Sequence, residues 1–120
     1  MITAYLYNSC TSCRKAAELL KDEAADFEIR EFFKLPFTGG ELASLLETTG
    51  LSVADLLSTR STPYRELELA SKDLGEEEII ALMLQEPRLL KRPILVSGTH
   101  VVVGYKAGEI KELVKLDRGA

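Results

Sequence analysis

Residues 2–32 have the sequence ITAYLYNSCTSCRKAAELLKDEAADFEIREF, and this stretch decides the fold. Its first six residues are rich in β-forming side chains and precede a polar pair, which predicts a strand. From Thr11 to about Glu23 the apolar residues recur at helical spacing while charged residues fill the other face, which predicts an amphipathic helix. Residues 27–32 alternate apolar and polar side chains, as a second strand does. The stretch therefore predicts a parallel β-α-β unit.

The middle of the chain, from about residue 38 to 86, predicts short helices. The pair Gly39-Gly40 precedes a helix expected over residues 41–48, and Gly50 is expected to stop that helix. Ser52 is expected to cap the next short turn. Because no repeat or linker interrupts the sequence, we expect a single domain over residues 1–120 that carries this helical insertion.

Past the insertion the β pattern returns. Residues 93–97 and 100–103 predict two strands, which the turn Gly98-Thr99 joins as a hairpin. A last amphipathic helix is expected from Ala107 to about Leu116. The order β-α-β, helical insertion, β-β-α is the thioredoxin or glutaredoxin-like topology. We therefore expect an α/β fold with a four-stranded mixed sheet.

Composition restricts the partners and the location of the chain. It has 120 residues, a formal net charge of −4 and a pI near 5.1. A net acidic surface argues against direct nucleic-acid binding and against attachment to anionic membranes. No apolar run approaches the roughly 20 residues that cross a bilayer. We expect a cytoplasmic protein, whose thiols are kept reduced and in which lasting structural disulfides are rare.

Cys10 and Cys13 are the two cysteines, and they lie three residues apart. A disulfide between them closes a very small loop, so it would stabilise the fold little. Because Cys10 is expected at the N-cap of the first helix, unpaired N–H groups and the helix dipole favour its thiolate. Cys13, in the first turn, would be the resolving thiol that forms a redox-active disulfide with Cys10.

Two other interpretations of the cysteine pair stay open. The pair can be two core cysteines that lie close by chance. It can also be half of a zinc site, although His100 is then the one further soft ligand and two carboxylates would be needed. A C-x-x-C before a β-α-β pattern favours redox work, so we expect no metal and no bound cofactor.

Arg92, Pro93 and Arg60 are the candidate residues outside the cysteine pair. In thioredoxin-like folds a proline that begins the third strand is usually cis and faces the dithiol, so Arg92 would point its charge toward Cys10. Arg60 is a cation in an otherwise uncharged stretch. Either arginine can instead be a solvated surface residue. Together with Cys10, they would form a cationic pocket for an oxyanion or for a carboxylate-bearing thiol such as glutathione.

The sequence resembles the arsenate-reductase-like (ArsC) branch of the glutaredoxins, which includes the Spx and MgsR regulators. The resemblance covers nearly the whole chain and rests on four motifs in the right order. These are Cys10-Thr11-Ser12-Cys13-Arg14-Lys15-Ala16, Ser58-Thr59-Arg60-Ser61, Lys91-Arg92-Pro93-Ile94 and Val103-Gly104-Tyr105.

The resemblance implies either of two functions. ArsC-type enzymes attack arsenate with the cysteine at the position of Cys10, hold it with arginines that match Arg60 and Arg92, and draw on glutathione and glutaredoxin. Spx-type regulators use the same Cys-Thr-Ser-Cys-Arg as a redox switch and bind the C-terminal domain of the RNA polymerase α subunit. The chain has Leu6 where the enzymes carry a histidine, and Ser52 where the regulators carry a glycine.

Our leading hypothesis is an ArsC-type thiol–disulfide oxidoreductase. Cys10 would be the nucleophile and Cys13 the resolving thiol, while Arg60 and Arg92 would hold arsenate or a glutathione mixed disulfide. Glutathione is a possible co-substrate, and glutathione, glutaredoxin or thioredoxin would be the reductant. The alternative is a redox-sensing regulator that binds the RNA polymerase α subunit through the helical insertion.

Overall fold

The computed structural model describes residues 1–7 and 9–119, which form two compact units. Unit 2 runs from Pro36 to Lys91, and unit 1 is made of the described chain on both sides of it. The predicted insertion therefore falls inside unit 2. That the units make up one domain stays a prediction. Among the described residues no helix combines the length and the apolar character that a membrane span needs.

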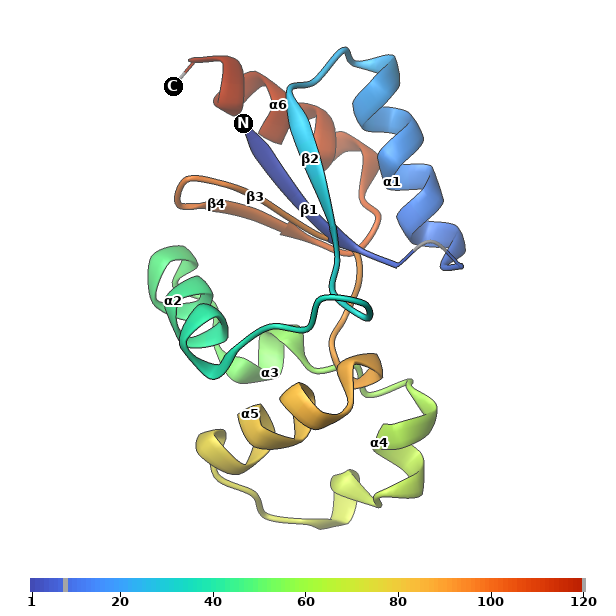
Figure 1. Cartoon of the computed structure of the whole chain (residues 1–120), viewed down its shortest axis with the longest axis vertical. Coiled ribbons are helices and arrows are strands. Elements are labelled where there is room, and N and C mark those ends of the chain that lie inside the picture. Colours follow the sequence, from blue (N-terminus) through green and yellow to red (C-terminus); the bar gives the residue numbers. More distant parts are fainter. Residues whose placement is uncertain (8, 120) are drawn as a thin grey trace. The chain divides into compact units, whose positions relative to one another are not determined.

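Unit 1 contains a four-stranded mixed sheet with the strand order β2-β1-β3-β4 (Figure 1). The first two strands are parallel, with Ile2 opposite Phe27, and the other two neighbouring pairs are antiparallel. This confirms the predicted fold class. The strands are β1 (Ile2–Leu6), β2 (Phe27–Glu31), β3 (Ile94–Ser97) and β4 (His100–Val103).

Two helices of unit 1, α1 (Thr11–Asp22) and α6 (Ala107–Gly119), lie side by side on one face of the sheet (Figure 1). Every second residue of β1 is buried, and these side chains form a core with the inward faces of both helices. The two-residue turn between β3 and β4 is present, and Gly98 takes there a φ of 58°, which an L side chain rarely adopts. The core fixes the start of α1 at the end of β1.

The helix α6 continues beyond the predicted end at Leu116. Its last turn carries Asp117, whose Oδ1 accepts a 2.7 Å hydrogen bond from the Ser97 hydroxyl and pairs with the Met1 ammonium at 3.1 Å. Arg118 donates to the backbone carbonyl of Glu23. These contacts stabilise the last turn against the sheet and α1, so the helix ends later than its apolar pattern indicates.

The regular elements of unit 2 are helices joined by turns and loops, together with an isolated β-bridge between Leu57 and Leu90. Its elements are α2 (Gly39–Thr49), α3 (Val53–Leu56), α4 (Thr62–Glu66), η1 (Leu69–Ser71), α5 (Glu76–Gln85) and η2 (Pro87–Leu89). The helix expected to begin at Glu41 begins two residues earlier. Thr38 and Glu41 form a capping box, which places the two glycines inside the first turn.

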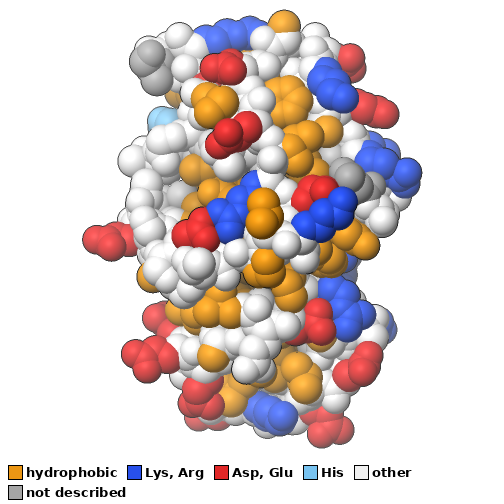
Figure 2. Space-filling view, in the orientation of Figure 1, with side chains coloured by type: hydrophobic (Ala, Val, Ile, Leu, Met, Phe, Trp, Pro, Cys, Tyr) orange, Lys and Arg blue, Asp and Glu red, His pale blue; other side chains and the backbone are white. Residues whose placement is uncertain are grey.

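Acidic and basic side chains are interspersed with apolar and uncharged surface on the face shown in Figure 2. The six large apolar residues that are more than a third exposed come from different elements and from both units. They are Met1, Ile29, Leu35, Leu67, Tyr105 and Leu116.

Candidate active site

The N-cap residue of α1 is Cys10. Its backbone is extended, with φ −85° and ψ 124°, while its carbonyl already accepts from the Arg14 N–H at 3.0 Å. No side-chain oxygen of the described residues caps this helix, so the Cys10 sulfur itself is the acceptor beside the N–H groups of its first turn. The Cys10 thiol is free and half-buried at the end of the helix. A thiolate there meets the positive end of the helix dipole.

Cys13 lies in the first turn of α1, and its side chain is fully buried within the core of unit 1. The backbone N–H of Tyr7 donates a hydrogen bond of 3.4 Å to its sulfur. Like Cys10 it is a free thiol. The pair therefore consists of one partly accessible sulfur and one that solvent does not reach.

The surroundings of Cys10 hold its pKa below the ordinary value of a cysteine. Burial alone would raise this pKa, but hydrogen bonds from the thiol and the backbone N–H of Cys13 lower it. The guanidinium of Arg92 lowers it further, through a hydrogen bond and through its charge. The hydrogen-bond donors outweigh the desolvation, so the thiolate is favoured at Cys10.

The pKa of Cys13 is raised to about 12. Burial is the main cause, because a thiolate in the core would lose its hydration. The hydrogen bond from Tyr7 opposes this rise, while the hydrogen bond to Cys10 and the charge of Cys10 add to it. Cys13 is thus held as a neutral thiol that donates to its neighbour.

Arg92 reaches Cys10 from the start of β3. The peptide bond between Arg92 and Pro93 is cis, as the topology predicts, and Pro93 is fully buried. The Pro93 carbonyl accepts from the Gly104 N–H at 2.8 Å, which fixes the backbone beside the arginine. The Arg92 side chain is half-buried, and its Nε is buried without a hydrogen-bond partner among the described residues.

The guanidinium of Arg92 also lies over an aromatic ring. Its central carbon is 5.3 Å from the centre of the Phe33 ring. Phe33 is in turn stacked on Tyr7, with ring centres 4.2 Å apart and an angle of 25° between the planes. Sequence reasoning missed Phe33, because nothing in its position distinguishes it from a core aromatic residue.

The structure brings together Cys10, Cys13, Arg92 and Pro93 in unit 1. The remaining candidate, Arg60, lies in unit 2, where it is exposed in the turn between α3 and α4. That turn leads to Ser61, whose side chain caps α4 by accepting from the Tyr64 N–H. The roles of these residues stay predictions.

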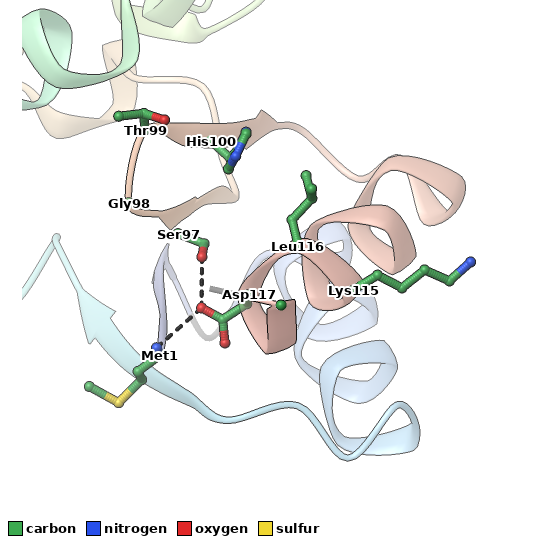
Figure 3. A pocket seen from close by; sticks show the side chains of 9 residues that line it. Met1, Ser97, Gly98, Thr99, His100, Lys115, Leu116 and Asp117 are labelled. Carbon is green, nitrogen blue, oxygen red and sulfur yellow. Dashed lines mark hydrogen bonds and ion pairs between the residues drawn. The ribbon is translucent and has the colours of Figure 1, made fainter.

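A pocket of about 660 Å³ lies elsewhere in unit 1 (Figure 3). It is lined by Met1, the β3–β4 turn, His100 and the end of α6. Because Met1 precedes β1 whereas Cys10 follows it, the pocket and the dithiol lie at opposite ends of this strand. Within residues 1–7 and 9–119, no three His, Cys, Asp or Glu side chains gather as metal ligands.

Comparison with known proteins gives consistent matches over almost the whole chain. A model of the ArsC family matches residues 5–113. The regulatory protein MgsR of Bacillus subtilis is 38% identical over 95% of this chain and 90% of its own length. The global transcriptional regulator Spx of Streptococcus pyogenes serotype M1 is 33% identical over 98% of this chain and 87% of its own.

Solved structures match equally well. An ArsC-family-related protein of Bacteroides fragilis superposes with a TM-score of 0.83 at 32% identity, over 93% of this chain and 97% of that one. An arsenate reductase from Vibrio cholerae has the same TM-score at 23% identity, over 92% and 95% of the two chains. At that identity the second likeness shows the fold alone.

Proposed function

This chain belongs to the ArsC family, and on that premise we propose that it is a thiol–disulfide oxidoreductase with Cys10 as nucleophile and Cys13 as resolving thiol. One observation carries the proposal. The two thiols have pKa values displaced in opposite directions, downward at the half-buried sulfur and upward at the buried one. Only a thiolate attacks a disulfide, so the reaction begins at Cys10.

The reaction of a glutathione mixed disulfide follows from this asymmetry. The Cys10 thiolate attacks one sulfur of the substrate, the substrate S–S bond breaks, and one thiolate leaves with the electron pair. Cys13 then loses its proton and attacks the Cys10 sulfur, which forms the internal disulfide and releases the second thiol. A thiol reductant, either glutathione or a thioredoxin-type protein, returns the pair to the dithiol.

The second step becomes easier once Cys10 has reacted. Burial is the main cause of the raised pKa of Cys13. The hydrogen bond to Cys10 and the charge of Cys10 are two further causes. Both disappear when the Cys10 sulfur is neutral in a mixed disulfide. The charge of Arg92, which lowers this pKa, remains. The resolving thiol is therefore inert until an intermediate exists.

The positive charge of Arg92 favours an anionic substrate. Its guanidinium places a positive charge beside the Cys10 thiolate, where an anionic group of a substrate can pair with it. Arsenate would accept two electrons from the dithiol, and glutathione would bring carboxylates. Leu6, which occupies the position of the enzymes' histidine, is buried in the core, so it supplies no polar group to arsenate. The mixed disulfide is therefore the substrate we favour.

A second candidate function is redox-sensing transcriptional regulation. The relatives MgsR and Spx, which match 95–98% of the chain, are both named as regulators. In this case the disulfide between Cys10 and Cys13 changes the affinity of the protein for the RNA polymerase α subunit. The chemistry of the thiols is the same as in the enzyme, but no substrate turns over.

One set of assays separates the two candidates. The reduced protein is mixed either with arsenate, glutathione and glutaredoxin or with a glutathione mixed disulfide and glutathione alone, since glutaredoxin would itself reduce that disulfide. Consumption of NADPH in a coupled reaction is the readout. We expect turnover of the mixed disulfide that is lost in Cys10→Ser and persists, at a lower rate, in Cys13→Ser. Turnover no higher than that of Cys10→Ser, together with redox-dependent binding of purified polymerase α subunit, would show the regulator instead.

A further inference from the structure

Arg92 can act on Cys10 only while its long side chain is held in place. An arginine side chain has several rotatable bonds, and it loses rotamer entropy when it is fixed. Its cis-linked neighbour Pro93 fixes the backbone but leaves the guanidinium free to turn. In the described part of the chain no carboxylate pairs with Arg92, so an ion pair does not fix it either.

Besides its hydrogen bond to Cys10, the guanidinium of Arg92 contacts the ring of Phe33. The guanidinium carbon lies 5.3 Å from the centre of this ring, within the range of a cation–π interaction. Phe33 is itself held from two sides, stacked on Tyr7 at 4.2 Å and packed edge-on against Phe32 at 5.0 Å between ring centres. Phe32 is fully buried. The ring is therefore a fixed support for the guanidinium of Arg92.

An aromatic ring has an advantage over a carboxylate at this place. A carboxylate would hold the arginine more strongly, but its negative charge would cancel the positive charge that favours the thiolate. The face of a ring attracts the cation through its quadrupole and carries no net charge. A ring can thus hold Arg92 and leave its charge available to Cys10.

We propose that Phe33 is a positioning residue that holds the guanidinium of Arg92 against the sulfur of Cys10. The inference rests on the proposed function, since it assumes that Cys10 is the nucleophile. The effect of Phe33 on the sulfur would pass through Arg92, which its ring contacts. Its replacement by a residue of similar volume without a ring should release Arg92 and weaken the stabilisation of the thiolate.

The test is the pH profile of Cys10 alkylation by iodoacetamide in the full chain. Below the wild-type pKa of Cys10, Phe33→Leu should slow alkylation about two- to fivefold, which corresponds to the loss of an ordinary cation–π contact. Phe33→Tyr keeps the ring and should retain the wild-type profile. At high pH, where the thiol is ionised in every variant, Phe33→Leu should be alkylated no more slowly than the wild type, because a thiolate of higher pKa is at least as nucleophilic. A loss of packing alone would not give this pH dependence.

A double-mutant cycle assigns the effect to the arginine. In an Arg92→Met background, Phe33→Leu should no longer change the profile. If it shifts the profile equally with and without Arg92, or leaves it unchanged in a folded protein, the inference is wrong. Should Phe33→Leu fail to fold, Phe33→Met replaces it. A wild-type profile like that of a free thiol would overturn the proposed function and this inference together.

Discussion

Cys10 and Cys13 are the same kind of residue one helical turn apart, and their surroundings make them different. Cys10 stands at the N-cap with donors from Cys13 and Arg92, whereas Cys13 points into the core. The C-x-x-C spacing predicts this asymmetry, because the N-cap and the first turn of an amphipathic helix have different exposure. The contact of Phe33 with Arg92 could not be predicted, since it joins residues 59 positions apart that the sheet topology brings together.

The buried thiol predicts an alkaline loss of stability. The folded-state pKa of Cys13, about 12, lies above the value of a free thiol, so on raising the pH the unfolded chain loses this proton first. The stability that the buried Cys13 thiol contributes is fully present below the pKa of this thiol in the unfolded chain. It is lost as the pH rises toward 12. The free energy of unfolding of Cys10→Ser should therefore fall over this range relative to Cys10→Ser/Cys13→Ala. The slope of the difference is at most about 1.4 kcal/mol per pH unit.

Urea unfolding of both variants between pH 8 and pH 11 measures this difference, and other titrating groups cancel because the variants share them. Replacing Cys10 leaves burial, the main cause of the raised pKa, in place. A difference that does not change with pH would mean that Cys13 has an ordinary pKa in the folded protein.

The helix ends of unit 2 show which sequence signals predict where a helix starts and ends. Ser52 caps α3 in a capping box with Asp55, and Gly50 ends α2, both as predicted. The sequence predicts that Gly39-Gly40 precede this helix, whereas both glycines lie inside α2. The side chain of Thr38 outweighs them by accepting the Glu41 N–H at 3.1 Å. Whether a glycine interrupts or continues a helix therefore depends on the capping groups beside it.

Gly50 and Gly40 provide a matched pair of substitutions in α2. Gly50 has a φ of 73°, and a Cβ at either glycine would meet nothing within 4 Å. Gly50→Ala should cost about 1 kcal/mol of stability through backbone strain alone. Gly40→Ala should stabilise the protein by up to about 1 kcal/mol. Chemical denaturation measures both, and a neutral Gly50→Ala would contradict the role of this glycine as the helix end.

For the whole molecule, the β-α-β pattern, the hairpin turn and the last helix were enough to predict the topology. Each is a local pattern, and the rule for parallel crossovers leaves few ways to join them. The change from strand to helix patterns locates the insertion that falls in unit 2, but no linker in the sequence indicates that this segment forms a separate compact unit.

The two units predict separate effects for the two candidate arginines. Cys13 and Arg92 are the groups that set the pKa of Cys10, and both belong to unit 1. Arg60 belongs to unit 2. Arg92→Met should therefore raise the pKa of Cys10, and Arg60→Met should leave the pH profile of alkylation unchanged. Arg14→Met, which removes an exposed cation of α1, is the control. An equal shift in Arg60→Met and Arg92→Met would contradict this division.

The central claim is that the dithiol consists of an accessible thiolate and a buried neutral thiol. It is tested most directly by labelling the reduced wild-type protein with iodoacetamide across pH 5–10 (about the range that native proteins tolerate) and locating the label by peptide mass spectrometry. We predict selective labelling of Cys10, with a midpoint below that of free cysteine, and an unlabelled Cys13 at neutral pH. Equal labelling of both residues, or a Cys10 midpoint at or above that of free cysteine, would contradict the account.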